Sequence, residues 1–388
     1  MSESILALNC GSSSIKFALF DRATLARAPA WSGRVVNIGG TGTSFEETGV
    51  AQQPLVAGGT DPYRAALAHI RDRVRARLGS DRIVAVVHRV VHGGAKYFAP
   101  VRVDAAVLAD LRGYIPLAPL HQPFALEAIA ELLATQPELP QVACFDTGFH
   151  RDMPAVEQML PLPRALRERG LRRYGFHGLS YEYLAFALGE RHGDRARGRT
   201  ICAHLGSGAS LCALRNLESV ATTMGFSALD GVMMNTRCGA LDPGVVIHLM
   251  QILKLSLDAV GRMLYHESGL LGVSGISADI RALLARADEV PAAEALALYV
   301  HRIVREAGAL AAVLGGLDML VFTAGIGEHS APIRERVCAG LRFLGVELDA
   351  AANAANAPVI SGVSSKVLVA VEPTNEEWIA ARAAAKLV

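Results

Sequence analysis

The sequence has almost no excess charge of either sign. Its 38 lysine and arginine residues are balanced by 37 aspartate and glutamate residues, which leaves a formal net charge of +1 over 388 residues. Proteins that bind the phosphate backbone of nucleic acids over a broad surface need a strong basic excess. We therefore expect no nucleic-acid partner.

Long apolar segments are missing as well. The hydrophobic fraction is 51%, yet glycines and charges such as Asp318 break the longest apolar stretches well short of the roughly 20 residues that a membrane span needs. The N-terminal residues include an acidic side chain and lack the basic region of a secretory signal. We expect a cytoplasmic protein without a membrane segment.

Motifs for disulfides and zinc are also absent. The six cysteines include no C-x-x-C pair, and no H-E-x-x-H or Cys/His metal spacing occurs, so we expect reduced, buried thiols and no structural zinc. Lysine is scarce, because only five of the 38 basic residues are lysines. Lys16 therefore stands out, since it follows a loop rich in glycine and serine.

What the sequence does contain is a repeated pattern of strand, turn and strand. Mostly apolar segments at 5–8 and 15–20 flank a turn at 9–14, and similar segments at 200–203 and 211–214 flank a turn at 204–210. The turns begin at Asn9 and His204, about half the chain apart. Because 388 residues exceed what one hydrophobic core usually supports, the repeat indicates two domains of related architecture.

Other segments fit an α/β fold. Residues 64–78 form an amphipathic helix with a basic, solvated side. The apolar strands 83–87 and 142–145 run into the polar residues Arg89 and Asp146, and ligands bind at the carboxyl ends of strands in open α/β sheets. Apolar residues 319–322 run into a glycine turn, and Pro332 begins a helix.

Three glycine-rich turns follow apolar strands, at 11–14, 206–210 and 325–327. Such turns can expose backbone N–H groups to a phosphate, although each alone is more typical of an ordinary tight turn. None matches a P-loop or a dinucleotide-binding turn. Together, on the half-repeat plan, they suggest a nucleotide held between two similar domains.

A second set of polar residues stands at strand ends or in short aromatic turns: Arg89, His121, Asp146, His177 and Arg237. Two arginines, a histidine and an aspartate suit the binding of a small anion and the stabilisation of charge on a transferring group. Isolated histidines of this kind are more often structural, and Arg237 could instead pair with Asp242. Asp146 and Glu376 are candidates for Mg²⁺, although Glu376 could simply be an acid at a helix start.

Eight motifs, in order from residue 5 to about 380, resemble the acetate kinase family. They are Asn9-x-Gly-Ser-Ser-Ser-x-Lys16, His88-Arg-Val-Val-His-Gly-Gly94, Phe145-Asp-Thr-Gly-Phe-His150, Arg173-Tyr-Gly-Phe-His-Gly178, His204-Leu-Gly-x-Gly208, Thr236-Arg-Cys-Gly239, Gly325-Ile-Gly-Glu328 and Pro373-Thr-Asn-Glu-Glu377. The resemblance implies an α/β, two-domain actin-like (ribonuclease H-like) fold with duplicated mixed-sheet domains that close around ATP. One domain would be 1–149 plus about 372–388, and the other 150–371.

The resemblance also implies the reaction and the roles of residues. ATP would phosphorylate acetate reversibly, with Mg²⁺, in a homodimer. The catalytic residues would be Arg89, His121, Asp146, His177 and Arg237; Asn9 and Glu376 would hold the metal with Asp146. The acyl pocket would be lined by Val91, Leu120, Phe176 and Ala228. The nucleotide would contact Ser12, Ser14, Lys16, His204, Leu205, Gly206, Ser207, Gly208, Asp279, Ile280, Arg281, Gly325, Ile326, Gly327, Glu328 and His329.

The sequence departs from the family pattern at a few positions. Ser207 and His329 replace asparagines, Asn235 and Ala240 replace glycine and aspartate, and Ala228 replaces a proline that lines the acyl pocket. A propionate or butyrate kinase of the same family, and a non-catalytic nucleotide-binding scaffold on the actin-like fold, are the alternatives. A scaffold needs the phosphate loops but not the set Arg89, His177 and Arg237.

Overall fold

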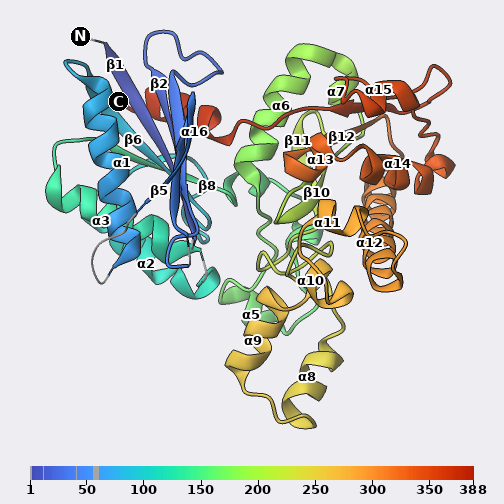
Figure 1. Ribbon diagram of the computed structural model, residues 1–388. Coiled ribbons are helices and arrows are strands. Elements are labelled where there is room, and N and C mark those ends of the chain that lie inside the picture. The colour runs from blue at the N-terminus through green and yellow to red at the C-terminus, as the bar shows by residue number, and fades with distance from the viewer. Residues whose placement is uncertain (1, 12, 41, 56–60, 120) are drawn as a thin grey trace. The chain divides into compact units, whose positions relative to one another are not determined.

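The chain divides into two compact units. The computed structural model describes residues 2–11, 13–40, 42–55, 61–119 and 121–388. Unit 1 consists of Met1–Phe149 and Asn375–Val388, and unit 2 of His150–Thr374 (Figure 1). Because the last helix returns to unit 1, residues from both ends of the sequence build that unit.

Unit 1 is built on one mixed sheet. Its described strands are β1 (Glu3–Cys10), β2 (Ser14–Asp21), β3 (Trp31–Val36), β4 (Ser44–Glu47), β5 (Val50–Pro54), β6 (Arg82–Val90), β7 (Val101–Arg102) and β8 (Gln141–Phe145). They lie in the order β5-β4-β3-β2-β1-β6-β8-β7. β1 pairs antiparallel with β2 and parallel with β6, and β6 pairs parallel with β8. The carboxyl ends of β1, β6 and β8 therefore share one edge.

Helices cover both faces of this sheet. They are α1 (Pro62–Leu78), α2 (Ala105–Gly113), α3 (Gln122–Thr135) and α16 (Glu376–Ala385). The side chains of β1 and β2 alternate, so that Leu6, Leu8 and Phe17 join the core under α1 and α3. α16 packs on β1 and β6, from the other side of the sheet (Figure 1).

Unit 2 repeats the same strand plan. Its described strands are β9 (Thr200–Leu205), β10 (Ala209–Arg215), β11 (Glu218–Thr222), β12 (Met319–Thr323) and β13 (Leu368–Val371), in the order β11-β10-β9-β12-β13. β9 pairs antiparallel with β10 and parallel with β12, and β12 pairs parallel with β13. This is the pattern of β3-β2-β1-β6-β8 in unit 1, so the predicted duplication of a mixed-sheet domain is confirmed.

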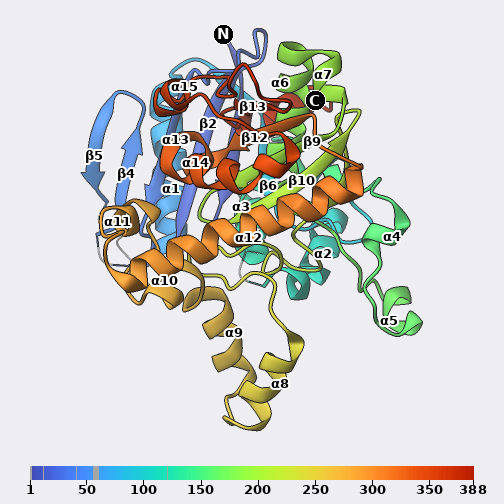
Figure 2. The same cartoon turned by 90° about the vertical axis from the view of Figure 1, so that its right-hand side faces the viewer.

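The described helices of unit 2 are more numerous, and most of them are short. They are α4 (Ala155–Gln158), α5 (Arg164–Glu168), α6 (Gly178–His192), α7 (Asp194–Arg197), α8 (Pro243–Gln251), α9 (Leu257–His266), α10 (Gly269–Ser274), α11 (Ile280–Leu284), α12 (Val290–Leu314), α13 (Ala324–His329), α14 (Ala331–Gly340) and α15 (Ala350–Ala354). α12 crosses one face of the sheet, as Figure 2 shows, and contacts β10. α8 and α9 extend away from the sheet in both views.

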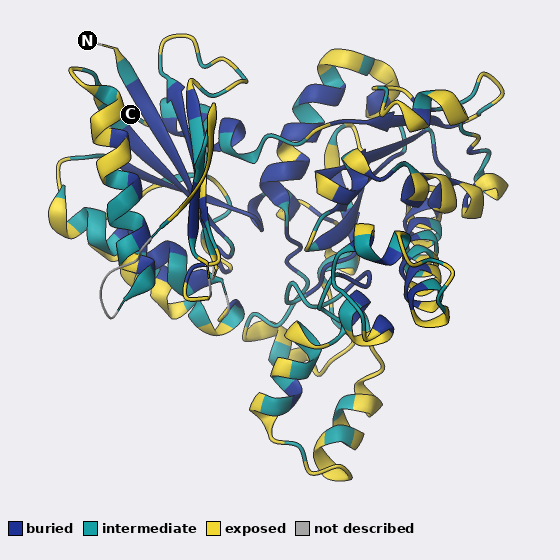
Figure 3. Ribbon diagram, viewed as in Figure 1, coloured by how far each residue is buried: buried dark blue, intermediate teal, exposed yellow. Residues whose placement is uncertain are grey.

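The strand and helix predictions agree with the structure, with one correction. The predicted hairpins, the helix at 64–78 and the helix at Pro332 are present, and the central strands of both sheets are buried (Figure 3). The glycine segment at 325–327, however, is not a turn. It forms α13, because Glu328 Oε1 accepts the N–H of Ala324 and Arg334 donates to the carbonyl oxygens of Gly327 and Glu328, which satisfies the two ends of this short helix.

Cysteine and membrane predictions can also be compared with the structure. All six cysteines are free, and five of them are buried, as predicted; Cys238 is only half-buried. Burial raises the pKa of the Cys10 thiol to about 11, so this thiol stays neutral near pH 7. Among the described residues, no helix is long and apolar enough to cross a membrane.

Each unit buries a neutral histidine in its interior. His88 lies in β6 with Nε2 2.8 Å from Gln141 Oε1, and His150 lies with Nδ1 2.8 Å from Ser219 Oγ and Nε2 2.9 Å from the carbonyl oxygen of Phe176. Burial lowers the pKa of each imidazole to about 4. In both cases burial outweighs the hydrogen bond that favours the charged form.

These histidines predict a loss of stability in acid. The unfolded chain binds protons near pH 6.5 and the folded chain only near 4, so stability is full above pH 6.5 and falls as the pH decreases toward 4. Each histidine should contribute up to about 1.4 kcal/mol per pH unit to the slope of the free energy of unfolding against pH. Urea unfolding at pH 7.5, 6 and 5 measures it. His150→Gln should flatten the slope, whereas the exposed His301→Gln should not; equal slopes in the two variants would contradict the prediction.

Candidate active site

Arg89 is the centre of a cluster of charged residues in unit 1. It stands one residue before the end of β6, opposite Cys144 of β8, and Asp146 follows β8 directly. Arg89 donates from Nε and Nη2 to the two carboxylate oxygens of Asp146, at 2.9 and 2.7 Å. Its Nη1 lies 2.8 Å from Glu376 Oε2, at the start of α16. The parallel register and the returning helix therefore place one guanidinium between two carboxylates.

The cluster is largely removed from solvent. The side chains of Arg89, Asp146 and Glu376 are 20, 3 and 12% exposed. Burial opposes the charge of Arg89, but Asp146 and Glu376 outweigh it and raise the pKa of the guanidinium above its usual value. Burial raises the pKa of Glu376 to about 7; Arg89 opposes this shift and the charge of Asp146 adds to it. A further cation near the two carboxylates would be favoured electrostatically.

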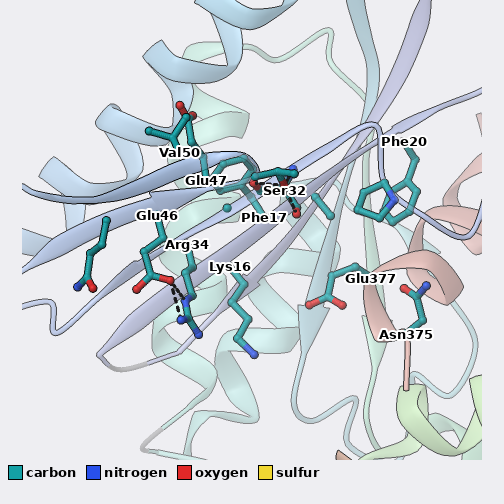
Figure 4. A pocket seen from close by; sticks show the side chains of 15 residues that line it. Lys16, Phe17, Phe20, Ser32, Arg34, Glu46, Glu47, Val50, Asn375 and Glu377 are labelled. Carbon is teal, nitrogen blue, oxygen red and sulfur yellow. Dashed lines mark hydrogen bonds and ion pairs between the residues drawn. The ribbon is translucent and has the colours of Figure 1, made fainter. Parts of the chain in front are cut away.

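The first hairpin turn lies at the same sheet edge. Asn9 of β1 is half-buried and pairs across the hairpin with Lys16 of β2. Gly11 donates its N–H to the carbonyl oxygen of Ser14 at 2.8 Å, which closes the turn. Ser12 lies outside the described residues. Lys16 is exposed and lines a groove of about 660 Å³ in unit 1, with Arg34, Asn375 and Glu377 also at its wall (Figure 4).

Two further predicted residues of unit 1 lie next to regular elements, one at the end of a strand and one at the start of a helix. Val91 follows β6 and is half-buried, and His121 is the N-cap residue of α3. The residues that follow Val91 and His121 are joined to each other: Gln122 Oε1 accepts the N–H of His92, and Gln122 Nε2 donates to the carbonyl oxygen of His92. Leu120 lies outside the described residues.

In unit 2, two imidazole rings stack at the start of α6 and the end of β9. His177 has the left-handed backbone conformation, with φ of 58°, and is the N-cap residue of α6. Its ring lies 4.2 Å from that of His204, centroid to centroid, at 15°. His177 Nδ1 is 2.8 Å from Ser210 Oγ, and His204 Nδ1 is 2.8 Å from Ser180 Oγ. A serine therefore holds each ring by its Nδ1 atom.

Arg237 and His177 approach the same glycine. A methyl group placed on Gly208 would lie 3.3 Å from His177 Nε2 and 3.5 Å from Arg237 Nη1. Glycine thus leaves room between the two donors. Arg237 also donates to the carbonyl oxygen of Ala228 at 3.0 Å, and burial lowers its pKa. Asp242, the alternative partner considered from the sequence, instead caps α8 through the N–H of Gly244.

Backbone contacts join the loops around these residues. The turn after β9, which includes Leu205 and Gly206, is closed by a bond from Gly206 N–H to the carbonyl oxygen of Gly208 at 3.1 Å, and Asn235 N–H donates to the carbonyl oxygen of Ser207 at 3.5 Å. Phe176 is only 2% exposed and lies directly before His177. The loop that carries Arg237 is therefore tied to the second glycine-rich turn.

The other predicted nucleotide residues lie on two short helices. Asp279 caps α11 and pairs with the exposed Arg281, with Nη2 2.6 Å from Oδ2, while Ile280 is buried. α13 carries Gly325, Ile326, Gly327, Glu328 and His329. It begins beside the turn after β9, because Thr323 of β12 pairs with His204. α13 therefore borders the carboxyl edge of the sheet of unit 2.

Two side chains fix α13 at its ends. Glu328 Oε1 accepts the N–H groups of Ala324 and Thr374, at 2.8 and 3.1 Å. Arg334, which is fully buried, donates at 2.9 Å to the carbonyl oxygens of Gly327 and Glu328 and also bonds Asn353. These bonds satisfy backbone groups that a six-residue helix leaves open, so the segment is held rigidly in unit 2.

Sequence reasoning missed the supporting residues of this unit, namely Tyr181, Ser180, Ser210 and Arg334. A signal for Tyr181 existed, because it stands four residues after His177 and therefore on the same helix face. Ser210 belongs to the second glycine-rich turn but was given no role. The position of Arg334 behind α13 depends on how α14 and α15 pack, which no local pattern indicates.

The donor set of unit 1 fits a magnesium ion. Among the described residues, no group of three or more histidine, cysteine, aspartate or glutamate side chains is arranged to hold a metal. Mg²⁺ does not require such a cage, because it usually takes one or two carboxylates plus the phosphates of a substrate. Asp146 and Glu376, joined to one guanidinium, offer two hard oxygen donors of this kind.

Comparison with known proteins gives one consistent result. Residues 4–382 match the acetokinase family. The acetate kinase of Rhodopseudomonas palustris is 48% identical, with 98% of both chains covered. Crystal structures of a propionate kinase from Francisella tularensis and of Porphyromonas gingivalis acetate kinase are each 34% identical over 98% of both chains, with TM-scores of 0.91 and 0.86. The chain belongs to the acetokinase family.

Proposed function

We propose that this protein is an acetate kinase, which transfers the γ-phosphoryl group of ATP to acetate and forms acetyl phosphate and ADP. A carboxylate oxygen of acetate attacks the γ-phosphorus, and the bond from that phosphorus to the β,γ-bridging oxygen breaks, so that ADP leaves. The observation that carries the proposal is the pairing of the family match with two charged clusters: Arg89 with the carboxylates of Asp146 and Glu376, and Arg237 with His177 around Gly208.

Arg237 and His177 supply positive charge and hydrogen-bond donors, and Asp146 and Glu376 supply carboxylates for a metal cation; phosphoryl transfer requires both. The substrates are anions, and the protein has little covalent chemistry to perform, so positioning and charge stabilisation account for most of the catalysis. We assign Arg237 and Arg89 to the carboxylate and the phosphoryl group, and His177 Nε2 to the phosphoryl oxygens. We propose that Asp146 orients the substrate oxygen and that His121 assists from α3.

We assign the nucleotide to the turns and short helices described above. Ser12, Ser14 and Lys16 would contact phosphates from one turn, and His204 to Gly208 from the other. Asp279 to Arg281, with α13, would border the adenosine. The rigid support of α13 by Glu328 and Arg334 supports this assignment, because a preorganised backbone loses little entropy when the nucleotide binds.

We propose Mg²⁺ as the cofactor, held by Asp146 and Glu376 with help from Asn9. The bound ion neutralises charge on the phosphate oxygens and on the leaving ADP. Arg89 keeps the two carboxylates together and limits their repulsion. The raised pKa of Glu376, to about 7, reflects burial that a cation would offset.

The direct test is the trapping of acyl phosphate with hydroxylamine. The protein should form a hydroxamate from acetate in the presence of ATP and Mg²⁺, and the stereochemistry at a chiral γ-phosphate should invert, because no phosphoenzyme intervenes. If no hydroxamate formed with formate, acetate, propionate or butyrate, the proposal would be wrong and a non-catalytic scaffold would be favoured. Net retention would contradict the direct transfer.

Ala228 determines which acid is preferred. The family pattern has a proline here, and we propose that Val91, Leu120 and Phe176 line the same acyl pocket. Loss of the ring should admit one more methylene, a change worth roughly 1–3 kcal/mol of discrimination. We expect a propionate kcat/KM within about tenfold of that for acetate and poor use of butyrate. Ala228→Pro should restore the preference for acetate, and it keeps the carbonyl that Arg237 contacts. A parent protein that favours acetate by two orders of magnitude would contradict this.

Glu376 is expected to set the Mg²⁺ requirement. Glu376→Ala should raise the Mg²⁺ concentration that gives the half-maximal rate, because one of two carboxylate donors is lost. As a first-turn acid alone, Glu376 would contribute only about 0.3–1 kcal/mol of stability. The matched control is Asp258→Ala, which removes a first-turn acid of α9. An unchanged Mg²⁺ requirement with a small decrease in Tm would favour the purely structural role.

We also propose a homodimer in the cytoplasm. α8 has no buried residue in the chain by itself, and its surroundings expose apolar side chains, including Ile247, Ile252 and Leu257 at 54, 64 and 70%. Contiguous exposure of this kind is typical of a protein–protein interface. The free cysteines agree with a reducing compartment. The mass in solution, from sedimentation equilibrium, decides the oligomeric state.

A further inference from the structure

The ring of His177 is hydrogen-bonded at Nδ1 to the first of two linked hydroxyl groups. Its Nδ1 lies 2.8 Å from Ser210 Oγ. Tyr181 Oη in turn lies 2.6 Å from Ser210 Oγ and donates to the carbonyl oxygen of Ser210 at 2.9 Å in one arrangement of its proton. Ser210 and Tyr181 have no exposed surface at all. His177, which is half-buried, therefore ends a chain of hydrogen bonds whose other members, Ser210 and Tyr181, are fully buried.

The backbone makes this chain rigid. His177 and Tyr181 are one helical turn apart at the start of α6, and Ser210 belongs to β10, which pairs with β9 at His204. The His204 ring stacks on the His177 ring at 4.2 Å, and Ser180 holds that second ring. The plane of the His177 ring is thus fixed by groups on three elements, and its Nε2 lies beside Gly208, where a Cβ atom would also approach Arg237 Nη1.

An anion bound at Nε2 would fix the protons of the chain. When an anion lies at Nε2, that nitrogen must carry the proton, so Nδ1 accepts from Ser210 and Ser210 Oγ accepts from Tyr181. If the ring takes a second proton, Ser210 accepts from Nδ1 and donates to Tyr181 Oη, which donates to the Ser210 carbonyl. The hydroxyl pair can therefore satisfy Nδ1 in both charge states while Nε2 keeps its proton.

The chemistry of the partner at Nδ1 distinguishes two roles. In a catalytic triad a carboxylate bonds Nδ1 and stabilises the imidazolium, which makes the histidine a base. Here the hydrogen-bonding position of Nδ1 is taken by a hydroxyl, and burial raises the pKa of the Tyr181 phenol well above its usual value, so the chain beyond Ser210 is neutral. A histidine supported in this way is suited to donate a hydrogen bond.

We propose that Ser210 and Tyr181 are positioning residues, which hold His177 as a hydrogen-bond donor to the transferring phosphoryl group and not as a general base. The role in phosphoryl transfer rests on the proposed function. The tautomer of His177 is independent of the proposed function, and it can be measured without turnover.

Four variants test the proposal. Ser210→Ala should lower kcat by roughly 10- to 100-fold, as the loss of a supporting partner behind an active-site histidine typically does, with the KM values for ATP and acetate within about threefold. Tyr181→Phe should have a smaller effect of the same kind. Ser210→Thr keeps the hydroxyl and should recover most of kcat. Ser219→Ala is the matched control, because it removes the serine behind the structural histidine His150.

The ring itself gives the second readout. ¹⁵N spectra of histidine-labelled protein, with the His177 signal identified from a His177→Gln sample, should show the Nε2–H form in the parent and a mixture of tautomers in Ser210→Ala. A parent with Nδ1–H, or a Ser210→Ala protein with unchanged tautomer and kcat, would overturn the proposal. If the parent formed no acyl phosphate but the tautomer behaved as stated, the proposed reaction would fail and the positioning of His177 would stand.

Discussion

Replacing Arg237 by alanine is expected to lower kcat/KM for acetyl phosphate formation by about 10²–10⁴, which corresponds to roughly 3–5 kcal/mol of transition-state stabilisation. Arg237 Nη1 lies beside Gly208, next to His177 Nε2, so its charge acts where that loop leaves room for an anion. Burial lowers its pKa, yet a guanidinium remains charged in proteins. Removal therefore deletes a weakly solvated charge, whose electrostatic effect is large.

Two comparisons make the Arg237 result specific. Arg237→Lys should recover little activity, because a point charge cannot reproduce the planar fork of arginine. Arg286→Ala, which removes an exposed arginine paired with Glu289 in the same unit, should keep activity within about twofold, since exposed ion pairs contribute little. If Arg237→Ala kept activity within about threefold with unchanged folding, the assignment would be wrong.

Arg89→Ala should cause a loss of activity of similar size, about 10²–10⁴ in kcat/KM, and also destabilise the protein. Without the guanidinium, Asp146 and Glu376 lose their shared counter-ion in a site where their side chains are only 3 and 12% exposed. Breaking a buried pair in this way costs about 3–5 kcal/mol, and the partial exposure of Arg89 places the expected value near the lower limit.

A double variant separates the two effects of Arg89. Arg89→Ala combined with Glu376→Gln removes one of the repelling charges, so urea unfolding should show that most of the lost stability returns. Activity should not return, because both the cation and a proposed metal ligand are then absent. Recovery of activity in the double variant would mean that Arg89 acts only by holding the carboxylates together.

Local sequence patterns predicted the secondary structure well for a physical reason. Hydrophobic periodicity and turn residues act over a few neighbouring positions, so the hairpins after Asn9 and His204 and the helix at 64–78 could be identified from the chain alone. The exception is the segment 325–327, where glycines suggested a turn. Glu328 and Arg334 satisfy the ends of α13 and so stabilise a helix that its own composition does not favour.

The sequence by itself determined the family, the duplicated strand plan and the identities of the polar residues at strand ends, because motifs and periodicity are properties of neighbouring residues. Only the tertiary structure decided which of these residues meet. Arg89 lies between Asp146 and Glu376 because β6 and β8 pair in one register and α16 returns to unit 1. His177 is backed by Ser210 and Tyr181 because α6 packs against the hairpin of β9 and β10. Such contacts depend on strand register and helix packing between residues far apart in the chain, and a local pattern carries no information about either.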